Sequence, residues 1–137
     1  MKKIILACSM AIVMSLTVVA TYAAPVKPIQ FAKGSVGTTI SGNFKGSNDV
    51  QYSLRAQAGQ TLTYKLTSNR NLAQINIYAP GDRPGTAEAL VIGSTTGTTG
   101  EVVLPESGNY LIQIYQMRNT ARQNIVVNYK LNVGVEN

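Results

Sequence analysis

Two arginines that are four positions apart lie near the C-terminal end of the chain. The segment QMRNTARQN at 116–124 holds Arg118, Asn119 and Arg122 between two patterns that are typical of strands. A guanidinium presents a planar fork of donors that matches a carboxylate, so the segment is suited to binding an acidic group on another molecule. Two plainer interpretations stay open: the arginines could be solvated charges at a hairpin end, and Asn119 could simply form the turn.

The sequence lacks the residue types that most often perform catalysis or bind transition metals. The chain has no histidine, and its single cysteine lies before residue 23. Serine triads, thiol mechanisms and zinc-type sites beyond that point are therefore excluded. The carboxylates are scattered without grouping, at Asp49, Asp82, Glu88, Glu101, Glu106 and Glu136. We expect a protein that is not an enzyme and that needs no cofactor or metal.

The N-terminal residues have the pattern of a cleaved secretory signal, residues 1–23. Lys2 and Lys3 precede an apolar run at 4–20, and small residues permit cleavage after Ala23. A membrane anchor is the alternative, but 17 apolar residues are short for a span, so we expect no stable membrane insertion. Cys8 resembles a lipoprotein attachment site, but too little apolar sequence precedes it, and we interpret it as part of the signal.

The mature chain, residues 24–137, is mildly basic. Its ten lysines and arginines exceed its six acids by four, and they are spread from Lys27 to Lys130 without a run. Nucleic-acid binding needs a basic stripe, ideally with aromatic residues for stacking, so nucleic acid is not an expected partner. With 114 residues and no disulfide, a single domain around one core is expected. From the signal pattern, we expect the mature protein in the periplasm of a Gram-negative bacterium.

Apolar and polar residues alternate with period two through most of the mature chain. The pattern predicts half-buried strands in DVQYSLRA (49–56), TLTYKLTS (61–68), QINIYA (74–79), NYLIQIYQM (109–117) and NYKLNVGV (128–135). In the fourth of these, Leu111 and Tyr115 are apolar on the second face as well. This indicates a central strand or one that a partner covers.

Glycines and prolines separate these runs at the short spacing of a β-sandwich. The stretch Gly81–Gly100 is the least patterned: only ALVI (89–92) is expected to form a short strand, and the remainder is expected to be a mobile loop. No segment has a helical stripe of apolar residues. The predicted fold is all-β, a single antiparallel β-sandwich of about seven to nine short strands.

Two stretches together resemble the bacterial pre-peptidase C-terminal type of β-sandwich, SGNFKGSNDVQYSLRAQAGQTLTYKL (41–66) and LPESGNYLIQIYQ (104–116). In such domains a glycine turn introduces a strand, here at Gly59, and Ser-Gly-x-Tyr begins the strand that crosses the core, here at Ser107. Elementary chemistry agrees with both positions. Gly59 can take a positive φ in a tight turn, and Tyr110 can bury its ring while its hydroxyl finds a partner.

Within that class the chain is similar to the periplasmic inhibitors of g-type lysozyme. The matching pieces run in order over most of the mature chain: FAKG (31–34), SGNFKG (41–46), AQAGQTL (56–62), LPESGNY (104–110), QMRNTARQN (116–124) and NYKLNV (128–133). The glycine turns occur in many sandwiches. Arg-Asn-x-Ala-Arg directly after the crossing strand is much more specific.

The resemblance implies a protein without enzymatic activity that lies over the substrate cleft of a g-type lysozyme and inserts loops towards its catalytic acid. The matching functional positions are Ser107, Arg118 and Arg122, although Ser107 could instead close its own turn. The family pattern carries a tyrosine where this chain has Ser47. That departure removes an aromatic group of the kind that often dominates an interface.

A second hypothesis is a binding module of the same fold that recognises a cell-wall glycan or another envelope protein. A glycan reader needs aromatic platforms on one face, whereas the chain has no tryptophan and its tyrosines occupy alternating positions that suit a core. Net charge does not separate the two hypotheses, because lysozymes are generally basic as well. The oligomeric state stays open.

Overall fold

The computed structural model describes residues 25–137, so the expected signal peptide, its cleavage site and Cys8 lie outside the described residues. Within this part, nine strands are joined by turns, loops and three single-turn helices. The strands are β1 (Val26–Pro28), β2 (Gly37–Lys45), β3 (Val50–Ala56), β4 (Thr61–Ser68), β5 (Ala73–Tyr78), β6 (Val91–Ile92), β7 (Thr99–Val103), β8 (Gly108–Gln116) and β9 (Val126–Glu136). The helices are η1 (Asn69–Asn71), α1 (Gly93–Thr96) and α2 (Arg118–Ala121).

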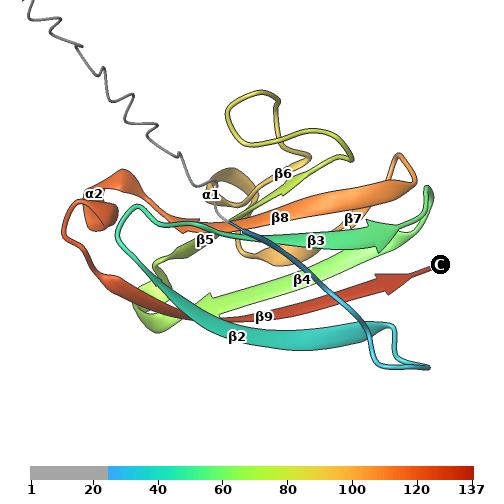
Figure 1. Ribbon diagram of the computed structural model, residues 1–137, viewed down its shortest axis with the longest axis horizontal. Coiled ribbons are helices and arrows are strands. Elements are labelled where there is room, and N and C mark those ends of the chain that lie inside the picture. The colour runs from blue at the N-terminus through green and yellow to red at the C-terminus, as the bar shows by residue number, and fades with distance from the viewer. Residues whose placement is uncertain (1–24) are drawn as a thin grey trace, which may run out of the picture.

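The strands form two sheets that pack face to face, which confirms the predicted β-sandwich (Figure 1). One sheet has the order β1-β3-β8-β5-β6 and the other has the order β2-β9-β4-β7. The pairings are antiparallel except at one edge, where β1 runs parallel to β3 with Val26 opposite Gln51. The chain leaves β1 for the other sheet instead of returning in a hairpin, so the pairing at this edge is parallel.

The inward faces of the predicted strands fill one core, as the alternation requires. Its most deeply buried side chains are Leu54, Leu62, Ile75, Ile77, Leu104, Tyr110, Ile112, Ile114, Val127 and Leu131. Strand β8 lies between β3 and β5 at the centre of its sheet, as the apolar residues on its second face indicated. Because β8 is anchored by neighbours on both edges, it is a rigid base for the segments at its two ends.

Two tyrosine contacts fix one end and the middle of this core. The buried Tyr110 hydroxyl donates to the Glu106 carbonyl at 2.5 Å and accepts from the Glu106 N–H at 3.0 Å, which holds the turn before β8. The hydroxyls of Tyr52 and Tyr129 lie 2.6 Å apart and join the two sheets across the core. Burial and the hydrogen bond with Tyr52 raise the pKa of Tyr129 well above its usual value, so the Tyr129 hydroxyl stays neutral in the folded protein.

The stretch Gly81–Gly100 has more regular structure than predicted. The expected strand is shortened to β6, and the helix α1 and the start of β7 follow it. Gly100 pairs with Tyr64 and lies under its ring, since a Cβ there would be only 2.8 Å from the tyrosine hydroxyl. The long-range contact of an aromatic ring with a glycine stabilises a strand that local propensity disfavours. Gly42 of β2, another strand without an apolar alternation, lies under Tyr129 in the same way.

Candidate functional site

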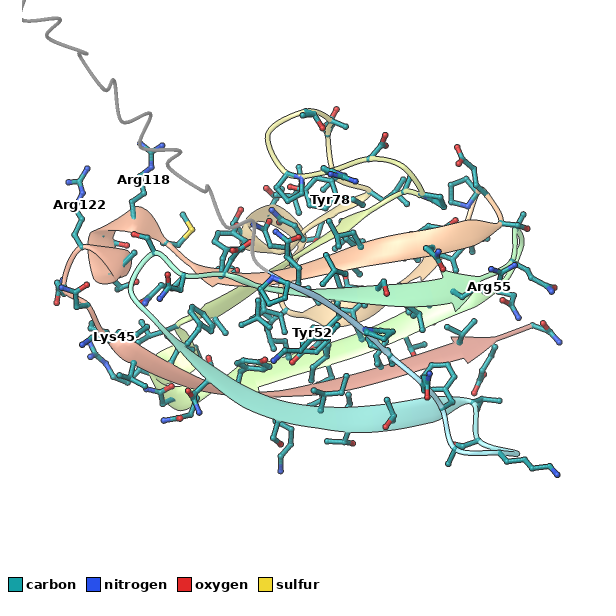
Figure 2. All side chains as sticks on the ribbon, in the orientation of Figure 1. Lys45, Tyr52, Arg55, Tyr78, Arg118 and Arg122 are labelled. Carbon is teal, nitrogen blue, oxygen red and sulfur yellow. The ribbon has the colours of Figure 1, made fainter. Side chains whose placement is uncertain are left out.

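The segment that carries the two arginines, expected to be a loop, forms the single helical turn α2. Arg122 continues the helical backbone with φ −60° and ψ −25°, and its N–H donates to the Arg118 carbonyl at 3.0 Å. Side chains four residues apart on a helix share a face, with about 5–6 Å between their Cβ atoms. Both exposed guanidinium groups therefore extend side by side, away from the sandwich (Figure 2).

Local hydrogen bonds explain why these residues are helical. The Met117 carbonyl accepts from the N–H groups of Thr120 and Ala121 at 3.2 and 2.9 Å, and the Asn119 Oδ1 accepts from the Thr120 N–H at 3.0 Å. The side chain of Ala121 is buried and anchors the turn to the sandwich. Asn119 thus takes part in the turn, but with a helical backbone. The left-handed position belongs to Asn124, whose φ is 54°.

A buried glutamine holds this turn in place. Gln116, the last residue of β8, is 6% exposed, and its Nε2 donates to the carbonyls of Gly46 at 3.0 Å and Ile125 at 2.9 Å. Gly46 follows β2 and Ile125 precedes β9, so one amide joins the β2–β3 turn to the segment that follows α2. Sequence reasoning missed Gln116, although a polar residue at an inward position of the β8 alternation was a signal for it.

The β2–β3 turn lies directly against the segment after α2. Gly46 has φ 61°, and a Cβ at this position would be 3.0 Å from the Asn124 Oδ1 and 3.4 Å from the Ala121 carbonyl oxygen. Its own N–H donates to the Ile125 carbonyl at 3.2 Å. Ser47, which replaces the tyrosine of the family pattern, is the next residue in the chain. The structure therefore places Ser47 at the same end of the sandwich as the two arginines.

We call this end, formed by residues 45–49 and 117–124, the arginine end. Lys45 lies there with the two arginines (Figure 2). The acid of the same end, Asp49, accepts hydrogen bonds at its Oδ2 from the Nε2 atoms of Gln51 and Gln113, at 2.8 and 2.9 Å. Its carboxylate is thus engaged by amides of the neighbouring strands. The arrangement favours a negatively charged group on a partner.

Ser107, the fourth predicted site residue, lies at the other end of β8. The nine residues of this strand separate it from α2 by about 25–30 Å. The Ser107 hydroxyl oxygen accepts from the Ala58 N–H at 2.9 Å and joins two turns at that end. The structure therefore brings Arg118, Asn119 and Arg122 together and leaves Ser107 apart, so the serine and the arginines cannot bind the same carboxylate.

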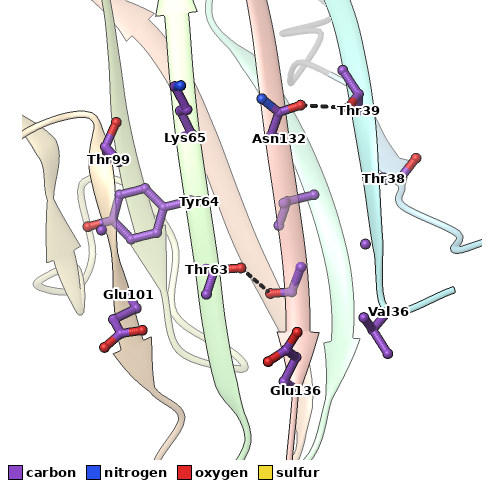
Figure 3. A pocket seen from close by; sticks show the side chains of 14 residues that line it. Val36, Thr38, Thr39, Thr63, Tyr64, Lys65, Thr99, Glu101, Asn132 and Glu136 are labelled. Carbon is purple, nitrogen blue, oxygen red and sulfur yellow. Dashed lines mark hydrogen bonds between the residues drawn. The ribbon is translucent and has the colours of Figure 1, made fainter.

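A groove of about 730 Å³ runs over the outer face of the four-stranded sheet (Figure 3). Threonines and an asparagine form its floor, where the Thr39 hydroxyl donates to the Asn132 Oδ1 at 2.5 Å. The groove is lined by one aromatic residue, Tyr64, which is 5% exposed. A buried ring offers no platform on which a sugar could stack, so the groove lacks the main feature of a glycan site.

The structure also bears on metal binding and on membrane-spanning helices. Among residues 25–137, no three side chains of the His, Cys, Asp and Glu types gather closely enough to hold a metal ion. In the same part of the chain, no helix has the length and apolarity needed to cross a membrane.

Comparisons with known proteins bear on the family of this chain. No family model matches it. The "Inhibitor of g-type lysozyme" from Escherichia coli (strain K12) is 25% identical over 108 residues, which are 79% of either chain. The crystal structure of Aeromonas hydrophila PliG, a periplasmic lysozyme inhibitor of g-type lysozyme, superposes with a TM-score of 0.76 and 40% identity. This match covers 81% of the present chain and 96% of PliG.

The chain belongs to the family of periplasmic inhibitors of g-type lysozyme. The resemblance found in the sequence is thereby confirmed, and so is the expectation that the chain is not an enzyme, since these relatives are inhibitor proteins. The pre-peptidase C-terminal domain of a Bacillus anthracis collagenase is 14% identical, with a TM-score of 0.56 over 84% of this chain and 98% of that domain. It shows that this chain shares the fold of such domains.

Proposed function

We propose that the protein is a periplasmic inhibitor that blocks the substrate cleft of a g-type lysozyme with its arginine end. The observation that carries the proposal is the geometry of α2, where a single helical turn aligns Arg118 and Arg122 in the same direction. Membership of the family supports the choice of enzyme. The contact residues are argued from the site itself.

The chemistry of the cleft matches the arginine end. A glycosidase positions carboxylates on either side of the bond that it cleaves, so an inhibitor that reaches into the cleft meets negative charge. Two guanidinium groups that share one helix face repel each other in the free protein, because like charges four residues apart are unfavourable. A carboxylate between them removes this repulsion and receives charge-assisted hydrogen bonds. Binding therefore gains from an arrangement that contributes nothing to folding.

The rigidity of the arginine end also supports inhibition by insertion. The Gln116 amide and the close approach of Gly46 fix the β2–β3 turn against the segment after α2. Groups that are already held in the bound geometry lose less conformational entropy when a complex forms. The protein thus presents its cations on two turns that support each other.

The glycan-binding alternative has less support. Of the six tyrosines in residues 25–137, five are buried, and Tyr115 alone is half-buried on the outer face of β8. Inhibition assays of the purified protein against g-, c- and i-type lysozymes test the proposal, and selective loss of g-type activity is expected. Inhibition of none of the three would favour the binding module.

Replacing Ser47 with tyrosine should leave inhibition unchanged or strengthen it. Ser47 is exposed in the β2–β3 turn beside α2, so a tyrosine can be accommodated without entering the core. If the ring packs on the lysozyme, it adds apolar contact of the kind that dominates many interfaces, and affinity rises by up to about tenfold. Titration of lysozyme activity with both proteins measures the change. Weaker inhibition by Ser47→Tyr would contradict the prediction and show that the interface has no room for a tyrosine ring at this turn.

Ser107→Ala should distinguish the roles of the two ends of the sandwich, because it should lower stability without weakening inhibition. The substitution removes the acceptor of the Ala58 N–H, and a loss of about 0.5–1.5 kcal/mol in the free energy of unfolding is expected. Inhibition should stay within about twofold, because the lost group lies far from the arginine end. Urea unfolding and the inhibition assay measure the two effects. A large loss of inhibition with little change in stability would instead indicate a second contact at the Ser107 end.

A further inference from the structure

A third turn lies at the arginine end and carries one more arginine. Strand β4 ends at Ser68, which pairs with Tyr129 near the start of β9, and β5 begins at Ala73, which pairs with Gln116 at the end of β8. The connection between β4 and β5 is η1, and the exposed Arg70 is at its centre. The strand registers therefore place Arg70 at the same end of the sandwich as α2, on the side of the β4 and β9 strands.

The backbone of this turn is unusual for its residues. Arg70 and Asn71 both have φ 53°, a left-handed conformation that asparagine tolerates but arginine rarely adopts. Two such residues in succession persist only where the surroundings hold them, and such positions concentrate at binding sites. The chain has glycine at most of its other positive-φ positions. An arginine thus occupies a backbone conformation that arginine residues normally avoid.

Side chains on both sides hold the turn in this conformation. The Asn69 Nδ2 donates to the Val126 carbonyl at 3.1 Å, and the Asn69 Oδ1 accepts from the Asn128 N–H at 2.7 Å. The Ser68 Oγ accepts from the Ala73 N–H at 2.9 Å. Through Val126, the turn is connected to the segment that follows α2. Its hydrogen bonds use Ser68 and Asn69, and the Arg70 side chain is left to solvent.

We propose that Arg70 is a further partner-contacting residue, which extends the arginine end so that it also binds a carboxylate on the rim of the partner's cleft. This inference rests on the proposed function and deepens it. Arg118 and Arg122 extend from α2, whereas Arg70 extends from the turn between β4 and β5, so the three cations span both sheets. A partner must then offer acidic groups at two separate places, which adds specificity beyond a single carboxylate at the bottom of the cleft.

The test compares two single variants of adjacent residues that share one backbone conformation. Arg70→Asn removes the charge, and asparagine tolerates the left-handed backbone, so the Tm should stay the same or rise. Asn71→Gly relaxes the same turn without changing the charge. Binding to a g-type lysozyme is measured by surface plasmon resonance at low and physiological salt. We expect Arg70→Asn to weaken binding by roughly three- to tenfold, with a slower association at low salt, and Asn71→Gly to bind like the parent.

Two outcomes would overturn the inference. Parent-like binding of Arg70→Asn would show that the charge is not used, and an equal loss in both variants would show that only the shape of the turn matters. The variant Arg118→Ala, run in parallel, separates this failure from failure of the proposed function. If Arg118→Ala loses affinity and Arg70→Asn does not, only the contact of Arg70 is refuted. If neither loses affinity, the arginine end is not the inhibitory surface.

Discussion

Replacing both Arg118 and Arg122 with alanine is expected to raise the Kd for a g-type lysozyme by roughly a hundredfold or more. Loss of one partner of a desolvated charge pair costs on the order of 2–5 kcal/mol, much of it because the remaining carboxylate is left unpaired. The two losses should not add fully, because both arginines share one face of α2 and act on the same site. Each single variant should therefore lose most of what the double variant loses.

Folding should hardly change in this double variant. Both side chains are exposed, and the turn depends on backbone hydrogen bonds and on the buried methyl group of Ala121. Removing two like charges from one helix face also relieves a small repulsion. Lysine at either position should restore only part of the affinity, since an ammonium lacks the planar fork of donors. The Tm of the variants is thus expected to equal or slightly exceed that of the parent.

Inhibition titrations and thermal melting measure these two quantities. The matched control is the double variant Arg55→Ala with Arg83→Ala, which removes the same charge from exposed positions outside the arginine end and should inhibit normally. Unaltered inhibition by the Arg118 and Arg122 double variant, with an intact Tm, would falsify the proposed contact. A similar loss in the control would indicate that overall charge, rather than the site, governs binding.

Gln116→Ala is expected to lower stability and inhibition together. The substitution leaves the buried carbonyl of Gly46 without its donor, and an unsatisfied buried group costs about 1–3 kcal/mol. The Ile125 carbonyl loses one of two donors, because it still accepts from the Gly46 N–H at 3.2 Å. Part of this is offset by the loss of an unpaired acceptor, because the Gln116 Oε1 has no hydrogen-bond partner among the described residues. A decrease of roughly 1–3 kcal/mol in the free energy of unfolding follows. The β2–β3 turn should then move independently of α2, and inhibition should weaken even where the protein is folded.

Urea unfolding and inhibition assays well below the Tm separate the two effects. The control is Gln57→Ala, which removes an exposed glutamine side chain just after β3, at the end of the sandwich opposite the arginine end. It should change stability by less than about 0.5 kcal/mol and leave inhibition intact. Parent-like inhibition by folded Gln116→Ala would show that the coupling of the two turns is not needed for binding.

Period-two alternation was sufficient to predict the strands that form the core, because it reports directly which side of a strand is buried. The strands β3, β4, β5, β8 and β9 follow from it, and so does the central place of β8. Strands β2 and β7 could not be predicted in this way. Each contains a glycine under a tyrosine ring of the neighbouring strand, at Gly42 and Gly100, and such a contact between distant residues leaves no local pattern.

The sequence by itself predicts which residues meet a carboxylate, and the motif Arg-Asn-x-Ala-Arg indicates the family. Tertiary structure alone decided how they are arranged. A helix of one turn is too short to be stable in isolation, so α2 depends on the burial of Ala121 and on the contacts of Gly46 and Gln116 with the segment beside it. Those contacts align Arg118 and Arg122. The length of β8 separates Ser107 from them, because an extended strand of nine residues holds the segments before and after it far apart.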